Sequence, residues 1–525
     1  MGADTETFLL VPGALPMVAL QRIHRGGETL VMDPAADAAI LRSAAVVRRA
    51  AEGNAPVYGV NTGFGKLAST RIAAADLATL QRNLIRSHAV GVGAPLPARV
   101  VRVLLATKAA SLARGHSGVR PMIIDTLLAV HNANIVPWIP AQGSVGASGD
   151  LAPLAHLTLA LCGEGEVVVD GRRVPALPVL QAAGIAPLEL AAKEGLALIN
   201  GTQVSTALAL DALLRFETVF AAALVIGAMT VDAARGSDAP FDARIHALRG
   251  QPGQIAVATA YRELLAGSAI RHSHLVDDDR VQDPYSLRCQ PQVMGACLDQ
   301  LRHAAAVLLR EANAVTDNPL VFADVNGRDG EVLSGGNFHA EPVALAADAM
   351  AVAIAEVGAI AERRIAMLID SNVSRLPPFL CADPGLNSGF MIAHVTAAAL
   401  ASENKSLAHP ASVDSLPTSA NQEDHVSMAT FAARRLSAMI DNTTHILGIE
   451  LLAAAQGIDF LRPLHTSPYL EEAHALVRLR SPQVRVDRYL APDIEAAAAL
   501  VGDGAIAAMV LHLPTAPPLF PAASA

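Results

Sequence analysis

Long stretches of this chain contain almost no glycine or proline, and they constrain its fold more than any other feature of the sequence. They cover residues 202–234, 343–368, 391–407 and 429–456. Each exceeds the ordinary helix length of about 11–12 residues. Such lengths predict a bundle of long, nearly antiparallel helices. Aromatic residues make up only 3% of the chain, and the abundance of small apolar residues favours close helix–helix packing over a β-sandwich.

The rest of the sequence adds few strands to this helical pattern. Val167 to Val174 is interrupted by Asp170-Gly171 and predicts a short hairpin, and residues 324–333 suggest another. We therefore expect a mainly all-α fold with a long central helix bundle and a few short β-hairpins. A chain of 525 residues is long enough for more than one packed unit. We divide it into an N-terminal helical domain, residues 1–205, and a long-helix bundle with a C-terminal helical region, residues 206–525.

Charge and cysteine content exclude several classes of protein. The 39 basic and 49 acidic residues give a net charge of −10, which argues against nucleic-acid binding and against a polybasic membrane anchor. The four cysteines form no CxxC pair, as is typical of a reducing compartment. The first residues lack the pattern of a signal peptide. The longest apolar run, 218–231, is shorter than the about 20 residues of a membrane span. We expect a soluble, cytoplasmic protein.

Several common functional motifs fail when their spacing is checked. Gly59 to Gly65 followed by Lys66 has one residue too many for a phosphate-binding loop, and Lys66 is not followed by Ser or Thr. There is no GxGxxG, no HExxH and no histidine cluster with zinc spacing. We therefore expect no metal site. The chain has only four lysines, which narrows the possibility of a pyridoxal enzyme without excluding it.

The most informative segment is Pro140 to His156, PAQGSVGASGDLAPLAH. Taken alone, it reads as a flexible loop in which Ser148 or Asp150 caps a helix. The whole segment, however, resembles the signature of the histidine and phenylalanine ammonia-lyase family. In that family the Ala-Ser-Gly tripeptide, here Ala147, Ser148 and Gly149, cyclises without help into the electrophile 4-methylidene-imidazol-5-one (MIO). The resemblance implies that the N-terminal domain carries this MIO loop and that no external cofactor is needed.

Further blocks extend the resemblance over essentially the whole chain, in the order expected of the family. They are YGVNTGFG at 58–65, NGTQ at 200–203, QDPYSLRCQPQ at 282–292, TDNP at 316–319, GGNFH at 335–339 and NQEDH at 421–425.

The resemblance assigns roles to residues in these blocks. Tyr58 would be the general base, which requires neighbours that stabilise its phenolate. Tyr285 would assist at the electrophile or in proton handling, and Arg288 would hold the substrate carboxylate as a bidentate pair. The remaining members would orient the ring or the substrate, or pack against the ring; they are Asn200, Gln282 and Phe338. Each of these side chains also admits a purely structural role, such as a satisfied core tyrosine or an interhelix ion pair.

Two positions indicate the substrate. His88, preceded by Ser87, and Glu423 both resemble the family members that act on histidine. A carboxylate can accept a hydrogen bond from an imidazole N–H, whereas a phenyl ring would leave that carboxylate desolvated and unpaired. We therefore expect L-histidine to be converted to trans-urocanate and ammonia, the first step of histidine degradation. An aminomutase and a phenylalanine or tyrosine lyase remain alternatives. A catalytically dead scaffold would be expected to have lost Ser148 or Tyr58.

The family also implies an assembly. We expect a homotetramer in which each active site draws on three chains. The acidic loop 272–279 has no role in this account, and we interpret it as a solvated surface.

Overall fold

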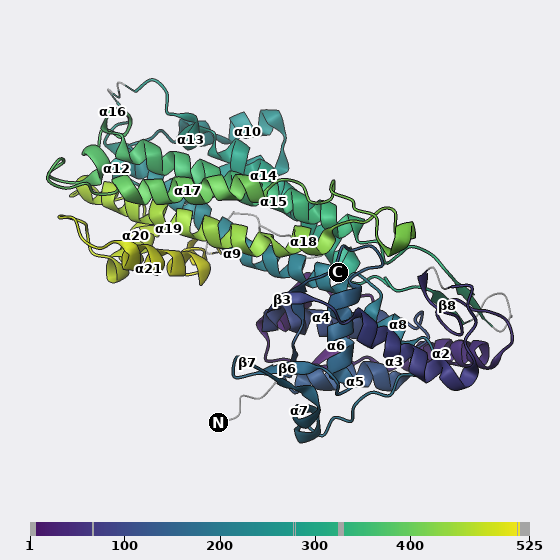
Figure 1. The fold of residues 1–525 in the computed structure, drawn as a ribbon. Coiled ribbons are helices and arrows are strands. Elements are labelled where there is room, and N and C mark those ends of the chain that lie inside the picture. The colour runs from purple at the N-terminus through teal and green to yellow at the C-terminus, as the bar shows by residue number, and fades with distance from the viewer. Residues whose placement is uncertain are drawn as a thin grey trace.

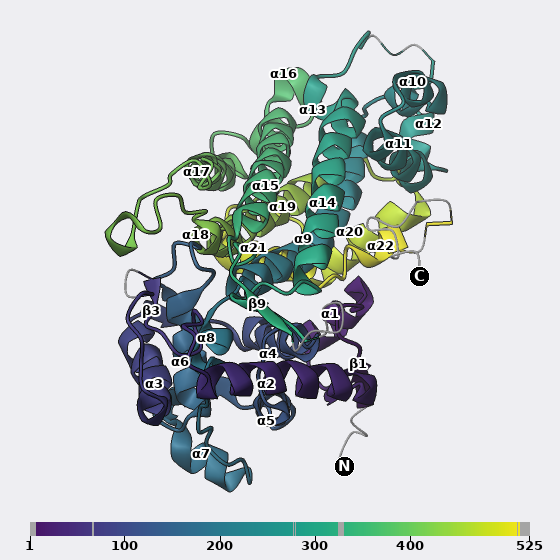
Figure 2. The same cartoon turned by 90° about the vertical axis from the view of Figure 1, so that its right-hand side faces the viewer.

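The long helices form one end of the molecule and the shorter N-terminal helices form the other (Figures 1 and 2). The computed structural model describes residues 7–65, 68–276, 278, 280–323, 330–511 and 513–514. Most of the acidic loop is described, but its Asp277 and Asp279 lie outside these ranges, as does nearly all of the chain beyond Leu513.

Five long helices build the bundle, and α9 runs through its centre. The five are α9 (Gln203–Ala233), α14 (Gln290–Ala312), α15 (Glu341–Ile369), α17 (Met391–Leu407) and α19 (Leu436–Phe460). The predicted long-helix segments are confirmed, except that residues 429–456 divide into α18 (Ala429–Arg434) and α19. Almost every residue of α9 is buried, because small and branched apolar side chains cover all of its faces.

A buried ion pair joins four of these helices close to the end of the bundle where α9 and α15 end and α14 begins. The guanidinium of Arg364 on α15 donates to both carboxylate oxygens of Glu450 on α19, at 2.5 and 2.8 Å, and both residues are completely buried. Thr230 on α9 donates to Glu450 at 2.7 Å, and Arg364 also donates to Gln290 on α14 at 3.1 Å. One polar group therefore fixes the relative positions of four helices.

Helices α9 and α15 are long and apolar enough to cross a membrane by length and composition. However, 78% and 72% of their apolar windows are buried inside the molecule, as expected for the core helices of a bundle. Shorter helices surround the bundle. These are α10 (Ala243–Arg249), α11 (Pro252–Leu265), α12 (Ala269–His272), α13 (Tyr285–Arg288), α16 (Ser371–Ser374), α20 (Pro468–Arg480), α21 (Ala491–Gly502) and α22 (Ala508–Leu511).

The N-terminal part packs around α4 and α6. Its helices are α1 (Met17–Arg25), α2 (Asp37–Glu52), α3 (Leu77–His88), α4 (Ala98–Ala113), α5 (Pro121–Asn132), α6 (Leu151–Leu161), α7 (Ala176–Ala182) and α8 (Glu194–Ile199). The division that we propose at residue 205 falls in the first turn of α9.

Strands are few and short. The predicted hairpin is present as β6 (Glu166–Val169) and β7 (Arg172–Pro175), with β4 (Val136–Pro137) beside β6. The second predicted hairpin overlaps β9 (Glu331–Leu333), which pairs with β8 (Leu320–Phe322); residues 324–329 lie outside the described ranges. The other pairs are β1 (Thr7–Leu10) with β2 (Thr29–Met32) and β3 (Val92–Pro95) with β5 (Pro140–Gln142). Strand β5 leads directly into the loop that precedes α6.

Candidate active site

The loop between β5 and α6 is compressed against two distant segments of the chain. Gly149 has φ +70°, and a Cβ at this position would lie 2.1 Å from the carbonyl oxygen of Gly201. Gly146 has φ +65°, and a Cβ there would lie 2.3 Å from Oγ of Ser427. These distances leave no space for a side chain, and the positive φ disfavours any residue other than glycine. The two glycines therefore let the loop fit between the start of α9 and the start of α18.

Asp150 anchors the C-terminal end of this loop. Its carboxylate is completely buried and accepts hydrogen bonds from the amide and hydroxyl of Ser205, at 2.8 and 2.9 Å. Thr430 and Ser144 donate to it at 2.6 and 3.1 Å. Burial raises the pKa of Asp150, and these hydrogen bonds oppose the shift. Asp150 makes no side-chain capping bond to α6, so the simple helix-cap interpretation of the loop is wrong.

The backbone of Ser148 is held by a chain of hydrogen bonds that ends at a buried lysine. Nδ2 of Asn200 donates to the carbonyl oxygen of Ser148 at 2.9 Å. Nζ of Lys108 donates to the backbone carbonyl of Asn200 at 2.7 Å. Lys108 is 1% exposed, and its burial lowers its pKa to about 7. The backbone of Ser148, which the sequence motif identifies as the source of the electrophile, is therefore held by Asn200, and the buried Lys108 holds Asn200 in turn.

Glu423 lies on the other side of Ser148. The Ser148 hydroxyl donates to one oxygen of the Glu423 carboxylate at 2.7 Å, and the hydroxyls of Thr418 and Ser419 donate to the other oxygen at 2.5 and 2.9 Å. Burial would raise the pKa of Glu423, but the three hydroxyls and the nearby His88 outweigh it and lower the pKa below its usual value. Glu423 is therefore a carboxylate with defined orientation.

His88 ends α3 and borders the same space. Its Nδ1 lies 2.8 Å from the carbonyl oxygen of Leu84, an acceptor, so Nδ1 carries the proton and Nε2 has a free lone pair. Burial lowers the pKa of His88, which favours the neutral form of the ring. An imidazole and a carboxylate thus lie at one site.

Two adjoining cavities surround Ser148. One, of about 440 Å³, and the other, of about 780 Å³, share Tyr58, Ser148, Asn200 and Glu423 in their walls. Ala147 and Phe338 line the smaller cavity and His88 lines the larger one. The hydroxyl oxygen of Tyr58 accepts a hydrogen bond from the amide of Gly65 at 3.4 Å. Among the described residues, neither cavity is lined by an arginine or a lysine.

The chain does not bring its three remaining predicted site residues to this place. Gln282, Tyr285 and Arg288 lie on and around α13, at the end of the bundle away from the N-terminal part (Figures 1 and 2). Gln282 and Arg288 line a separate cavity of about 340 Å³. Tyr285 is 71% exposed, and the Arg288 guanidinium lies 4.6 Å from its ring centroid. Nε of Arg288 is buried and has no hydrogen-bond partner among the described residues.

The sequence motifs missed several residues that hold the site. Lys108 is one of only four lysines in the chain, and this scarcity was a usable signal. Thr418 and Ser419 precede the NQEDH block, and Ser427 and Thr430 follow it, so the block could have been extended in both directions.

The chain is similar to known proteins over nearly its whole length. The family model for aromatic amino acid lyase matches residues 15–479. Histidine ammonia-lyase of Rhodospirillum rubrum is 64% identical over 507 residues, which cover 96% of this chain and 98% of that protein. Among solved structures, histidine ammonia-lyase of Trypanosoma cruzi has a TM-score of 0.88 and 42% identity, covering 98% of this chain and 96% of that chain. Tyrosine aminomutase of Streptomyces globisporus has a TM-score of 0.90 and 37% identity, covering 97% and 99%.

Proposed function

We propose that this chain, which belongs to the aromatic amino acid lyase family, is a histidine ammonia-lyase that converts L-histidine to trans-urocanate and ammonia. It would act as a carbon–nitrogen lyase in the first step of histidine degradation. The observation that carries the proposal is the position of the Glu423 carboxylate, 2.7 Å from the Ser148 hydroxyl, with His88 in the wall of the same cavity. The imidazole of histidine carries an N–H that can donate a hydrogen bond to such a carboxylate, whereas the rings of phenylalanine and tyrosine carry no ring N–H.

The loop fits a 4-methylidene-imidazol-5-one group made from Ala147, Ser148 and Gly149. Only glycine can occupy position 149, Ala147 is buried, and Asn200 donates to a carbonyl that would become part of the ring. The group would supply an electrophile that takes up the substrate amine and makes ammonia a better leaving group. It would form by loss of two water molecules, one on ring closure and one from the Ser148 side chain.

The chain's own residues would supply substrate binding and proton transfer. Glu423 would accept the imidazole N–H, and its lowered pKa keeps it charged for this role. Tyr58 would accept the β-proton of the substrate on its phenolic oxygen, where the Gly65 amide helps to stabilise negative charge. The electrons of the β C–H bond would then form the carbon–carbon double bond as the carbon–nitrogen bond breaks and ammonia leaves.

A second copy of the chain would complete the site. The substrate carboxylate needs a cation, and the described walls of both cavities hold no arginine or lysine. Arg288 has a buried Nε without a partner among the described residues, and it lies beside the exposed side chains of Val281 and Tyr285, which are 96% and 71% exposed. We therefore keep the expected homotetramer, in which Gln282, Tyr285 and Arg288 of one copy reach the Ser148 cavity of another.

The proposed location is the cytoplasm. The four cysteines are all free in the structure, which supports a reducing compartment. Cell fractionation followed by detection of the protein would test this.

Product analysis tests the function. Purified protein is incubated with L-histidine, L-phenylalanine or L-tyrosine, and the products are separated and identified by ultraviolet absorbance. Urocanate and free ammonia from histidine alone would support the proposal. β-Histidine would indicate an aminomutase, and cinnamate or coumarate would contradict the roles of His88 and Glu423. The absence of any product would contradict the proposed activity.

A further inference from the structure

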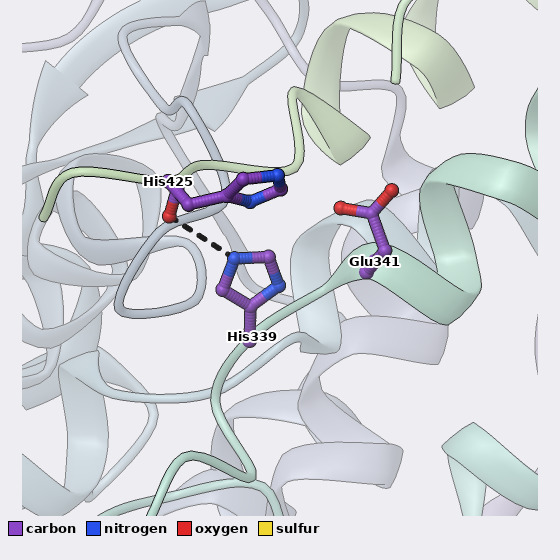
Figure 3. Close-up of side chains that lie close together, drawn as sticks. All are labelled: His339, Glu341 and His425. Carbon is purple, nitrogen blue, oxygen red and sulfur yellow. Dashed lines mark hydrogen bonds between the residues drawn. The ribbon is translucent and has the colours of Figure 1, made fainter. Parts of the chain in front are cut away.

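We propose that His339, Glu341 and His425 form a binding site for a divalent transition-metal ion of the Zn²⁺ class, at the edge of the active-site cavity. Each of these residues offers one ligand atom, and the three atoms all lie within 4.8 Å of one another. Figure 3 shows the Glu341 carboxylate turned towards the two imidazole rings. The site is separate from the groups assigned above to catalysis and does not depend on the proposed activity.

The hydrogen bonding of His339 prepares it to bind a metal. Its Nε2 lies 3.1 Å from the backbone carbonyl oxygen of His425 (Figure 3). Because a carbonyl oxygen can only accept, Nε2 must carry the proton, and Nδ1 is left with a free lone pair. Metal-binding histidines commonly show this arrangement, in which a carbonyl fixes the tautomer and the orientation of the ring.

Glu341 supplies the negative charge. It is the first residue of α15, and its Oε2 is buried without a hydrogen-bond partner among the described residues. A buried carboxylate oxygen with no partner is unfavourable. A cation between Glu341 and the two rings would satisfy this oxygen, and no described side chain does so.

The donor set selects the class of ion. Two imidazoles and one carboxylate are typical of zinc sites that keep one coordination position open, whereas Mg²⁺ and Ca²⁺ prefer oxygen ligands alone. Tetrahedral zinc with ligands at about 2.0–2.2 Å requires the donor atoms to lie about 3.3–3.6 Å apart. The three ligand atoms lie within 4.8 Å of one another, so side-chain rotations at the three residues can bring them to this spacing.

A bound ion would also affect the active-site cavity, because two of its three ligands line that cavity. His339 and His425 line the same cavity of about 440 Å³ as Ser148 and Glu423. His339 follows Phe338, and His425 lies two residues after Glu423. A bound ion would tie these two segments together and thereby restrain both walls of the cavity.

Equilibrium zinc binding tests the site. The full-length protein is prepared without an affinity tag, stripped with a chelator and titrated with Zn²⁺. We expect about one ion per chain at high affinity, and a loss of affinity of about 10-fold or more in Glu341→Gln and in His425→Asn. The matched control is His445→Asn, which removes a histidine that also lies beside a carboxylate, Glu495, but outside the cluster.

Cobalt provides an independent measurement. The stripped protein loaded with Co²⁺ should show the strong visible absorption of a tetrahedral or five-coordinate ion, and His339→Asn should abolish it. Circular dichroism of each metal-free variant establishes that it is folded. Equal zinc binding by wild type, Glu341→Gln and His425→Asn would overturn the proposal, as would a weak, octahedral cobalt spectrum. Because neither readout uses turnover, failure of the lyase assignment would leave this result interpretable.

Discussion

The hydroxyl of Ser148 donates a 2.7 Å hydrogen bond to Glu423, a residue 275 positions further along the chain. The loop that carries Glu423 is held in an uncommon conformation, since Ser419, Ala420 and Asn421 all have positive φ, between 50° and 64°. Non-glycine residues adopt this conformation only when their surroundings impose it. The Glu423 carboxylate is therefore held in a defined position beside Ser148, the residue from which the proposed electrophile would form.

Ser148→Ala should fold and assemble like the wild type and lose nearly all turnover of histidine. The substitution removes the hydroxyl that must leave as water, while alanine fits the space that serine occupied. Steady-state kinetics would measure the loss, and the intact mass should lack the decrease of two water molecules expected for the wild type. Ser406→Ala, an exposed change on α17, is the control. Normal activity in Ser148→Ala would contradict the electrophile assignment.

Glu423→Gln should lower kcat/KM for histidine by about 10–100-fold, the size expected for losing a hydrogen bond to a charged group. The ratio of kcat/KM for histidine to kcat/KM for phenylalanine should fall at the same time.

The lowered pKa of Glu423 also predicts that the stability of the protein depends on pH. The stability that its charge contributes should be complete above the pKa of an unfolded glutamate and be lost as the pH falls through the lower folded pKa. Melting experiments from pH 7 to pH 3 would measure the difference in stability between wild type and Glu423→Gln. A difference that stays constant over this range would contradict the prediction.

The sequence predicted the long helices well because their boundaries depend on local composition. The predicted segment 391–407 coincides with α17, and 343–368 lies within α15. The break at Arg435 between α18 and α19 has no glycine or proline to mark it; Arg435 reaches across to Asp348 on α15, a contact that only the tertiary fold creates. In the same way, motifs located Arg288 in the sequence but could not show that α13 lies at the far end of the bundle. Lys108 was missed because its importance comes from burial.

Lys108→Met should change how the stability of the protein depends on pH. Folding forces Lys108 into a buried site, where its pKa falls to about 7 from the 10.5 of an ordinary solvated lysine. Between these pH values the unfolded chain binds one more proton than the folded chain, so the stability of the wild type should rise with pH. The melting temperature of Lys108→Met relative to wild type should therefore be highest near pH 7 and fall towards pH 10.

The same variant should turn over histidine more slowly, because the carbonyl of Asn200 loses its donor and the Asn200 amide is less well placed on Ser148. Lys405→Met, which changes an exposed lysine, provides the control for both measurements. A melting difference that does not vary with pH would contradict the buried-lysine account.

Glu450→Ala should lower the free energy of unfolding by about 3–5 kcal/mol, because it leaves the completely buried Arg364 without its counter-charge. Replacing both partners with apolar side chains, Arg364→Met with Glu450→Leu, should cost much less. Denaturant-induced unfolding of the single and double variants measures the difference. A smaller loss of unfolding free energy in Glu450→Ala than in the double variant would contradict the role of the ion pair in positioning the four helices.

Two inactive variants should restore each other's activity when they assemble together. In the proposed tetramer a working site needs Ser148 from one copy and Arg288 from another, so Ser148→Ala and Arg288→Ala should each be inactive alone. If equal amounts of the two variants assemble at random, about a quarter of the active sites would contain both wild-type residues.

The two variants are co-expressed in one cell, and the assemblies that carry both are purified and assayed with L-histidine to measure the recovery. A mixture of separately purified tetramers, assayed before subunits exchange, is the control. If co-assembled variants stay inactive although light scattering shows a tetramer, Arg288 does not act across a subunit boundary, and the carboxylate of the substrate must be bound by a group within the same chain.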